Sequence, residues 1–226
     1  MGNNTFIVLS TINTDFGVFS PEERFWQTVH TLYSIHNQAP KAKIYFLDNS
    51  IEPLNYVWKE SISSRVDVFE QMEHNVFTQM INGNRGWGEA YMMPLALERI
   101  KQHGMVEDRI FKLSGRYFLQ KSFDISAYTP EVYGKYVFKV NQWDVSKDDF
   151  KTHRERVVYF ETRLWSFCGS LFDEYQALMP KLFQSMFTIQ NWEKAHHALI
   201  PHDKVIDFPK VHVEGLTAET GIIKIE

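Results

Sequence analysis

Cysteine is nearly missing from this sequence, which contains a single one, Cys168, in 226 residues. One cysteine excludes an intrachain disulfide. Its neighbourhood, LWSFCGSLF, is apolar, and free cysteine is among the most buried residue types. We therefore interpret Cys168 as a small buried hydrophobe rather than as a nucleophile. A reducing compartment fits this composition.

Long hydrophobic runs and blocks of like charge are missing as well. No apolar window approaches the ~20 residues of a membrane-spanning helix. The opening MGNNTFIVLS has no basic region before a long apolar stretch, which a signal peptide would need. The formal net charge is -4, and no cluster of Lys and Arg indicates nucleic-acid binding. We expect a soluble, cytoplasmic protein with no membrane span and no nucleic-acid partner.

Apolar residues are plentiful, at 44% of the chain with 15% aromatic, so a globular fold with a substantial core is expected. In the first half, short apolar runs alternate with segments of helical periodicity. Strands are predicted at 5–12, 42–50, 66–73 and 108–115, and helices at 20–39, 52–64 and 86–104. This alternation predicts a parallel α/β sheet with helices on both faces.

The second half of the chain is less regular. Residues 133–143 and 156–172 have the pattern of longer, antiparallel strands. Residues 172–202 read as largely helical with a break at Pro180, and a short strand with a glycine-containing tail follows at 203–221. The sequence shows no repeat and no linker, so we predict one domain, 1–226, with two functional halves that divide near residue 120.

Polar residues gather where the predicted parallel strands end. Such residues often only form turns, but ligands of open parallel sheets bind at this edge, and four groups at one edge favour a nucleotide site. We expect Asp48 to accept from a base or ribose, and Gly86 and Gly88 to let the backbone approach the ligand. Trp87 is the best aromatic candidate for lining this pocket. The groups are Ser10, Thr11 and Asn13; Asp48, Asn49 and Ser50; the loop NGNRGWGEAY at 82–91; and Lys112, Ser114, Gly115 and Arg116.

Three of these stretches carry a resemblance. STIN (Ser10–Asn13), LDNS (Leu47–Ser50) and NRGWGEA (Asn84–Ala90) follow one another as in GT-A-type glycosyltransferases, most like the family-2 group, over roughly residues 5–120. The resemblance implies a GT-A-like, Rossmann-like α/β fold, with a mostly parallel sheet flanked by helices and a small antiparallel and helical acceptor half. Residues 1–120 would then bind a nucleotide-diphosphate sugar, and residues 121–226 an acceptor.

The implied activity is transfer of the sugar to a glycan or lipid-linked acceptor, in surface polysaccharide or lipopolysaccharide synthesis. The candidate donor-binding residues are Thr11, Asn13, Asp48, Asn49, Asn84, Gly86, Trp87, Gly88, Glu89, Lys112, Ser114, Gly115 and Arg116.

The sequence departs from that family at the end of the fourth predicted strand. The family places an Asp-x-Asp motif there to hold a divalent metal, whereas this chain reads KLSGRY, Lys112–Tyr117. The Arg116 fork and the Lys112 point charge can neutralise a diphosphate directly, while Gly115 lets the backbone approach. The alternative is that Arg116 pairs with a buried carboxylate such as Glu89 or Glu161. No cofactor is certain, and a divalent cation (Mn²⁺ or Mg²⁺) stays open.

Sugar transfer with inversion needs a carboxylate that takes the acceptor proton. Glu193 is the first candidate because it lies beside Trp192 at the start of a helix, although it can equally be a solvent-facing residue of a first turn. Glu161 is the second candidate, and it can instead pair with Arg163 or Arg116. We expect no metal ligand; His212 is the candidate if there is one, and a strand-end histidine is the simpler interpretation.

Two other functions compete with the transferase. A degenerate module of the same fold would bind a nucleotide or glycan without turnover, and the missing carboxylates favour it. A sugar-phosphate nucleotidyltransferase shares the sheet but normally carries a glycine-rich basic loop after the first strand. The corresponding STINTDFGVF is not such a loop, so this function ranks last.

Overall fold

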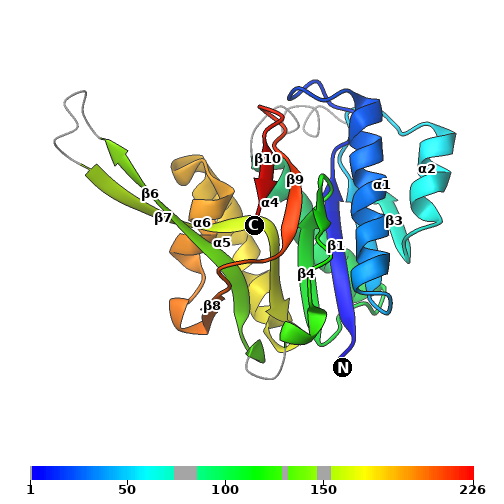
Figure 1. Ribbon diagram of the computed structural model, residues 1–226. Helices are drawn as coiled ribbons and strands as arrows, with labels where there is room; N and C mark the ends of the chain where they lie inside the picture. Colours follow the sequence, from blue (N-terminus) through cyan, green and yellow to red (C-terminus); the bar gives the residue numbers. More distant parts are fainter. Residues whose placement is uncertain (1, 74–85, 129–131, 147–153) are drawn as a thin grey trace.

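The computed structural model describes residues 2–73, 86–128, 132–146 and 154–226 (Figure 1). The strands are β1 (Asn4–Ser10), β2 (Lys43–Asp48), β3 (Val68–Gln71), β4 (Arg109–Ser114), β5 (Tyr117–Leu119), β6 (Tyr136–Ser146), β7 (Arg154–Cys168), β8 (Val205–Asp207), β9 (Val213–Leu216) and β10 (Ile223–Ile225). The helices are α1 (Pro21–Gln38), α2 (Tyr56–Ser63), α4 (Trp87–Gln102), α5 (Phe172–Ile189) and α6 (Trp192–Leu199), and short 3₁₀ turns lie at Ile125–Ala127, Gly169–Leu171 and His202–Lys204.

The main sheet has seven strands in the order β3-β2-β1-β4-β7-β6-β8. Strands β1 to β4 run parallel, and β7 then pairs antiparallel with β4. The register places Ser10 opposite Asp48 and Leu9 opposite Ser114, so these strands end at one edge. This confirms the predicted mostly parallel α/β sheet and the common edge for its polar strand ends.

Side chains alternate between two cores because successive residues of a strand point to opposite faces. Ile7 and Leu9 of β1 belong to a core beneath α4, α5 and α6. Phe6 and Val8 belong to a second core beneath α1, which also contains residues of α2 and of the smaller sheet. The buried strands therefore read as continuous apolar runs, as predicted.

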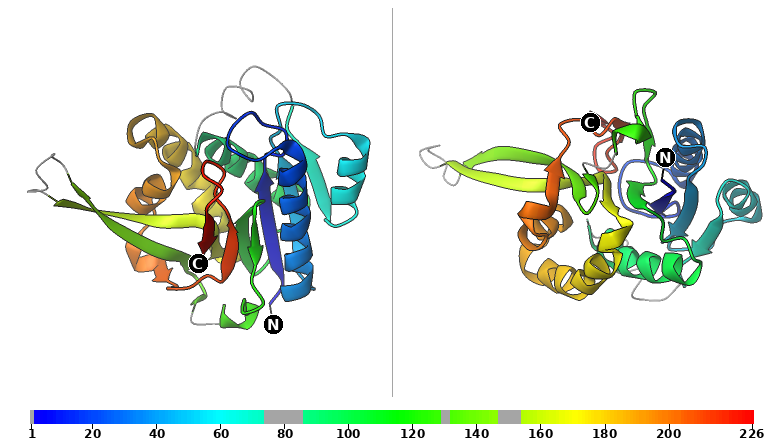
Figure 2. Two further views of the ribbon diagram at one scale, coloured as in Figure 1. Left: turned by 45° about the horizontal axis from the view of Figure 1, so that its top comes forward. Right: turned by 90° about the horizontal axis from the view of Figure 1, so that it is seen from below.

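Helices form a layer on each face of the main sheet. Helices α4, α5 and α6 cover one face of the sheet, and α1 and α2 cover the other (Figure 2). A second, antiparallel sheet is formed by β10, β9 and β5. Strands β6 and β7 pair antiparallel, as predicted, and extend beyond the other strands as an arm (Figure 1). Cys168 is 2% exposed, which confirms it as a buried side chain.

Helix α1 begins where the sequence signals a start. Ser20 and Glu23 form a capping box: the Glu23 amide donates to Ser20 Oγ, and the Ser20 amide donates to Glu23 Oε2. Each bond satisfies an amide that the first turn of the helix leaves without a partner. Pro21 follows at the first helical position, where its missing N–H costs nothing.

One expectation about the helices was wrong. Pro180 does not break α5, which continues to Ile189, and the chain turns instead at Gln190, with φ at 53°. The helix holds because five of its side chains, three before the proline and two after it, are buried in one stripe, and this packing outweighs one lost backbone bond. The stripe consists of Phe172, Tyr175, Met179, Leu182 and Met186. Among the described helices, none is both long and apolar enough to cross a membrane.

Candidate functional site

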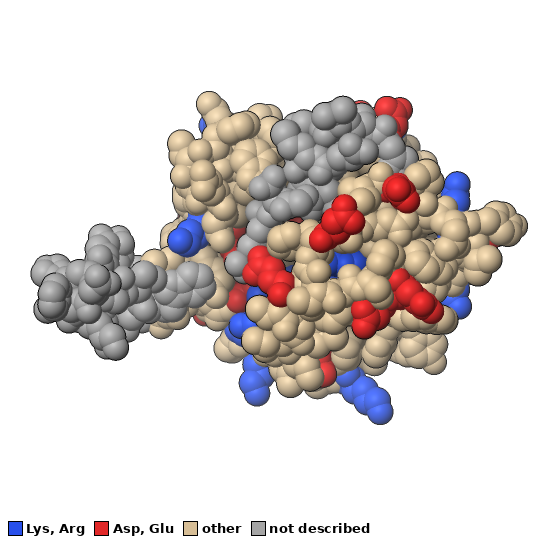
Figure 3. Space-filling model, turned by 90° about the horizontal axis from the view of Figure 1, so that it is seen from above, with Lys and Arg blue, Asp and Glu red and all other residues tan. Residues whose placement is uncertain are grey.

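A pocket opens at the edge of the sheet where β1 and β4 end. Its lining comes from the ends of β1 and β4 with the loop after β1, the first turn of α4, and the turn between α5 and α6, and α1, β7 and the segment after β9 add further residues. Seen from the carboxyl ends of β1 and β4, a basic surface lies in a hollow that acidic side chains surround (Figure 3). The polar and charged residues of its lining are Ser10, Thr11, Thr14, Arg24, Asn49, Glu89, Ser114, Arg116, Tyr117, Thr162, Arg163, Gln190, Asn191, Glu193, Thr217 and Glu219.

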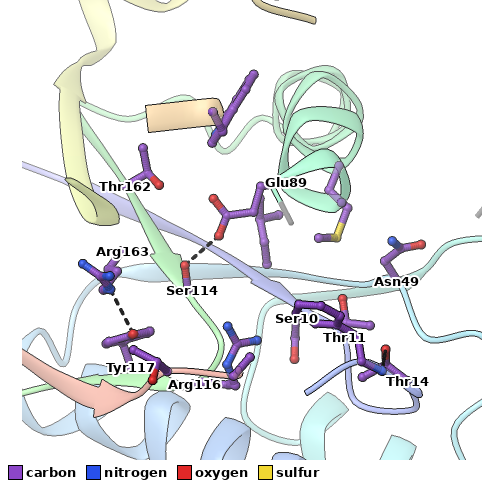
Figure 4. Close-up of a pocket in the computed structure, with 18 of the residues that line it drawn as sticks. Ser10, Thr11, Thr14, Asn49, Glu89, Ser114, Arg116, Tyr117, Thr162 and Arg163 are labelled. Carbon is purple, nitrogen blue, oxygen red and sulfur yellow. Dashed lines mark hydrogen bonds between the residues drawn. The ribbon is translucent and has the colours of Figure 1, made fainter. Parts of the chain in front are cut away.

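A buried ion pair forms one wall of this pocket. Lys112 Nζ lies 2.6 Å from Glu89 Oε1, and it also donates to Ser114 Oγ at 2.8 Å and to the Thr162 carbonyl at 2.7 Å. Ser114 in turn donates to Glu89 Oε1 at 2.8 Å, and Glu89 reaches from α4 toward it (Figure 4). Lys112 is 1% exposed and is not part of the lining. Its expected role as a point charge on a diphosphate therefore does not match its position.

Arg116 does line the pocket. Its Nε is buried, and within the described part of the chain it has no hydrogen-bond partner. Burial lowers the pKa of this guanidinium, and the nearby charge of Glu89 opposes that shift. Among the described residues, the ion pair of Glu89 is with Lys112, so the expected alternative, an Arg116–Glu89 bridge, is not the arrangement observed.

Glu161 lies outside the lining and is 2% exposed. It accepts hydrogen bonds from Arg163, from Asn141 and, at 3.2 Å, from Tyr159. This is the salt-bridge alternative that the sequence left open for Glu161, with Arg163 as the partner. A carboxylate outside the lining whose two oxygens already accept these hydrogen bonds is not placed to meet a ligand in the pocket.

Arg163 faces the pocket and is held by several groups. It forms ion pairs with Glu161 and Glu226, and its Nε donates to Tyr117 Oη at 2.9 Å. Although burial disfavours its charge, these two carboxylates raise the pKa of Arg163. The guanidinium is thus a fixed cation on the pocket wall.

Glu193 lies in the pocket, in the first turn of α6. Asn191 caps that helix, since its Oδ1 accepts from the Lys194 amide at 2.8 Å. Trp192 beside it is 3% exposed and packs edge-on against His196, with ring centroids 4.3 Å apart. The turn at Gln190 and this packing hold the start of α6 at the pocket, and the charge of Glu193 acts on both Lys112 and Arg163.

Asp48 and Asn13 organise the loops instead of lining the pocket. Asp48 is fully buried, and it accepts from the amides of Ile12 and Ser50 and from Gln71 Nε2. Burial raises the pKa of Asp48 to about 6. The Asn13 amide donates to Ser50 Oγ at 2.8 Å. These bonds join the loop after β1 to the loop after β2, whereas Thr11 and Asn49 do line the pocket.

Of the predicted glycines and Trp87, some line the pocket and others do not. Gly86 and Gly88 line the pocket, and Gly86 takes a φ of 77° at the N-cap of α4. Gly115 is not in the lining; its close neighbour is Ser10. Trp87 packs against Phe183 and Phe187 of α5 rather than lining the pocket. Asn84 lies outside the described residues.

The groups at the end of β4 do not fit a divalent cation. Ser114, Gly115 and Arg116 offer a hydroxyl and a guanidinium, whereas hard cations prefer several carboxylate or carbonyl oxygens. In the described ranges no three His, Cys, Asp or Glu side chains are grouped so as to hold a metal. His212 is not in the lining, and its Nδ1 is 2.9 Å from Ser122 Oγ.

Sequence reasoning missed two cations of the pocket. Arg24 is 2% exposed and donates to the carbonyls of Thr11, Phe16 and Phe19, so that it holds the loop after β1. Its place in the first turn of α1 gave no signal of this role. Arg163 was considered only as a partner for Glu161. Both reach the pocket from segments that the strand-end rule does not cover.

Comparison with solved structures defines the fold class. The chain resembles the WbbM bifunctional glycosyltransferase (9% identity, TM-score 0.53, 91% of this chain and 38% of that chain). It resembles a 4-diphosphocytidyl-2C-methyl-D-erythritol synthase (9% identity, TM-score 0.52, 96% of this chain and 94% of that chain). It also resembles the core-mannan synthase CmsA/Ktr4 of Aspergillus fumigatus in its Mn/GDP form (10% identity, TM-score 0.50, 91% of this chain and 72% of that chain).

These neighbours show a GT-A-type fold, as the sequence predicted. The present chain spans well under half of the WbbM chain. No protein-family model matches the sequence, and no curated protein matches it either. Because the same fold serves both glycosyltransferases and a nucleotidyltransferase, the activity has to be argued from the site.

Proposed function

We propose that this protein is a glycosyltransferase that moves a sugar from a nucleotide-diphosphate donor to a glycan or lipid-linked acceptor. The observation that carries the proposal is Arg116, whose buried Nε has no partner in the described part of the chain and whose side chain lines a pocket at the strand ends. A buried donor without a partner is costly, and a diphosphate oxygen would satisfy it. The proposed pathway is surface polysaccharide or lipopolysaccharide synthesis.

The proposed donor site works without a divalent metal. Arg116 supplies a planar fork for phosphate oxygens, and Arg163 adds a second guanidinium on the wall, whose charge Glu161 and Glu226 already balance. The hydroxyl and guanidinium at the end of β4 support this proposal, because they offer poor ligands for Mn²⁺ or Mg²⁺. The neighbour CmsA was solved with Mn and GDP, so metal dependence is the point at which the two proteins would differ.

Glu193 is the proposed general base. It lies in the same pocket as Arg116, on a different element, so an acceptor hydroxyl can lie between the base and the sugar. As the hydroxyl oxygen forms its bond to the sugar carbon, its proton passes to the Glu193 carboxylate, and the nucleoside diphosphate leaves with the electron pair of the broken bond. Positive charge around Arg116 stabilises that leaving group.

A binding module remains the second candidate, because Lys112 and Ser114 already engage Glu89 and thereby occupy part of the polar wall. An assay of UDP-glucose and GDP-mannose hydrolysis, which measures the UDP or GDP released, separates the two functions. The enzyme is expected to hydrolyse one of them slowly, equally with and without EDTA, and to lose that activity in Arg116→Ala. Binding of UDP or GDP without any turnover would identify the module instead.

A further inference from the structure

The ion pair of Lys112 and Glu89 joins the apolar core to the pocket: Lys112 is buried, and Glu89 belongs to the lining. Lys112 belongs to β4, on the face that packs beneath α4 and α6. An ammonium has three donors, and those of Lys112 have three acceptors: Glu89, Ser114 and the Thr162 carbonyl. Lys112 therefore has nothing left to offer a ligand.

Glu89 is the member of this cluster that reaches the pocket. Its side chain is 24% exposed, against 1% for Lys112, and it forms part of the lining. Both the bond from Lys112 and the bond from Ser114 go to Oε1. In the hydrogen bonds and ion pairs between described residues, Oε2 has no such donor. One carboxylate oxygen is therefore anchored, and the other is available at the pocket wall (Figure 4).

As a purely structural device, the pair would contribute little to the stability of the fold. A buried ion pair seldom stabilises a fold more than apolar residues of the same size would. Although burial would raise the pKa of Glu89, Lys112 holds it below its usual range, so the carboxylate stays ionised in the pocket. The arrangement is suited to presenting a fixed acceptor to something that enters.

A fixed carboxylate selects its ligand by chemistry. It repels phosphate and accepts from hydroxyl groups, so it cannot share the diphosphate with Arg116. We propose that Glu89 is the residue that accepts hydrogen bonds from hydroxyls of the donor sugar, and that Lys112 and Ser114 are positioning residues that anchor it. The inference rests on the proposed function, and it orients the donor: the diphosphate lies at Arg116 and the sugar at Glu89.

The test compares a sugar nucleotide with the same nucleotide lacking its sugar. Calorimetry gives Kd for UDP and UDP-glucose, and for GDP and GDP-mannose. Within each pair, the sugar increment is the Kd of the nucleoside diphosphate divided by the Kd of the sugar nucleotide, so a value above 1 means that the sugar strengthens binding. In the unmodified protein we expect an increment of about 10 or more for one pair. Glu89→Gln should reduce that increment about 10-fold or more, because a hydrogen bond to a charged group is lost.

A structural role is separated by a second variant. Glu89→Gln leaves Lys112 buried without its counter-ion and can unfold the protein, whereas Glu89→Gln combined with Lys112→Met removes both charges. The double variant is expected to recover stability and still lack the increment. Recovery of both stability and increment would mean that the pair serves only the core, and this would overturn the inference.

Two further outcomes are distinguishable. If neither UDP nor GDP binds, the proposed donor site itself fails. If one of them binds but no increment exists for its sugar nucleotide, the donor site stands and the role of Glu89 is contradicted. Lys112→Met alone should keep the Glu89 side chain but lower the increment, since one of the two groups that anchor it is gone.

Discussion

Gly115 lies so close to Ser10 that a Cβ at position 115 would be 2.8 Å from both Cβ and Oγ of Ser10. The Gly115 amide also donates to the Leu9 carbonyl at 2.8 Å, and Thr31 Oγ1 donates to the Gly115 carbonyl. This contact fixes the end of β4 against β1 just before Arg116. The glycine of the KLSGRY stretch thus serves the approach of two strands rather than that of a ligand.

Gly115→Ala should therefore destabilise the protein. Forcing a methyl group into this contact shifts the backbone and costs about 1–3 kcal/mol of unfolding free energy. Urea unfolding measures the loss. Gly88→Ala is the matched control, because its Cβ would meet only Asn49 Nδ2 at 3.7 Å and alanine favours a helix. Equal stability of the two variants would contradict the account.

Asp48 gives a prediction about pH. Its folded pKa of about 6 lies above its usual 3.8, because the group is buried. The folded state then binds the proton more tightly, so the stability that Asp48 contributes is fully present below pH ~4 and declines as pH rises through 6. The difference in unfolding free energy between the unmodified protein and Asp48→Asn should shrink from pH 4.5 to pH 7.

The decisive result is whether the stability difference between the unmodified protein and Asp48→Asn shrinks or grows as pH rises. An amide at position 48 places an N–H₂ among donors from Ile12, Ser50 and Gln71, so the variant should be less stable by about 1–3 kcal/mol. A difference that grows as pH rises would mean that hydrogen bonds to the carboxylate outweigh its burial.

Glu193 and Glu161 differ in what their loss should do. Glu193→Gln is expected to lower kcat for sugar transfer by about 10²–10⁴, the usual contribution of a general base, with a smaller change in KM. Glu161→Gln breaks a buried ion pair with Arg163 and should cost about 3–5 kcal/mol of stability. Steady-state kinetics beside thermal unfolding tells them apart. Full activity in Glu193→Gln would remove it as the base.

Much of the fold could be predicted because its signals are local. The buried run of β1 and the Ser20 cap of α1 both involve neighbours in sequence. That Ser10 and Asp48 share one edge follows from the rule that parallel strands have their carboxyl ends on the same side of the sheet. The predicted break at Pro180 failed because the packing of α5 depends on residues of other elements.

The site was predictable in place but not in detail. The KLSGRY stretch predicted a basic strand end, but it did not show which of its two cations would face the ligand. Lys112 is turned to Glu89, 23 positions earlier in the chain, while Arg116 lines the pocket. Arg24 and Arg163 come from α1 and β7, and nothing in their local sequence indicates a shared pocket. Pairings of this kind depend on tertiary contacts.

The most direct measurement is the thermal stability of the protein with UDP, GDP and other nucleoside diphosphates, in EDTA and in Mn²⁺. A ligand at 100 times its Kd stabilises the folded state by about 2.7 kcal/mol, which is a shift of several degrees for a chain of this size. Arg99→Ala is the matched control, because it removes an exposed arginine of α4 that is outside the lining. We predict a shift that persists in EDTA and in Arg99→Ala and is lost in Arg116→Ala. A shift that needs Mn²⁺, or that survives in Arg116→Ala, would contradict a metal-free diphosphate site built on Arg116.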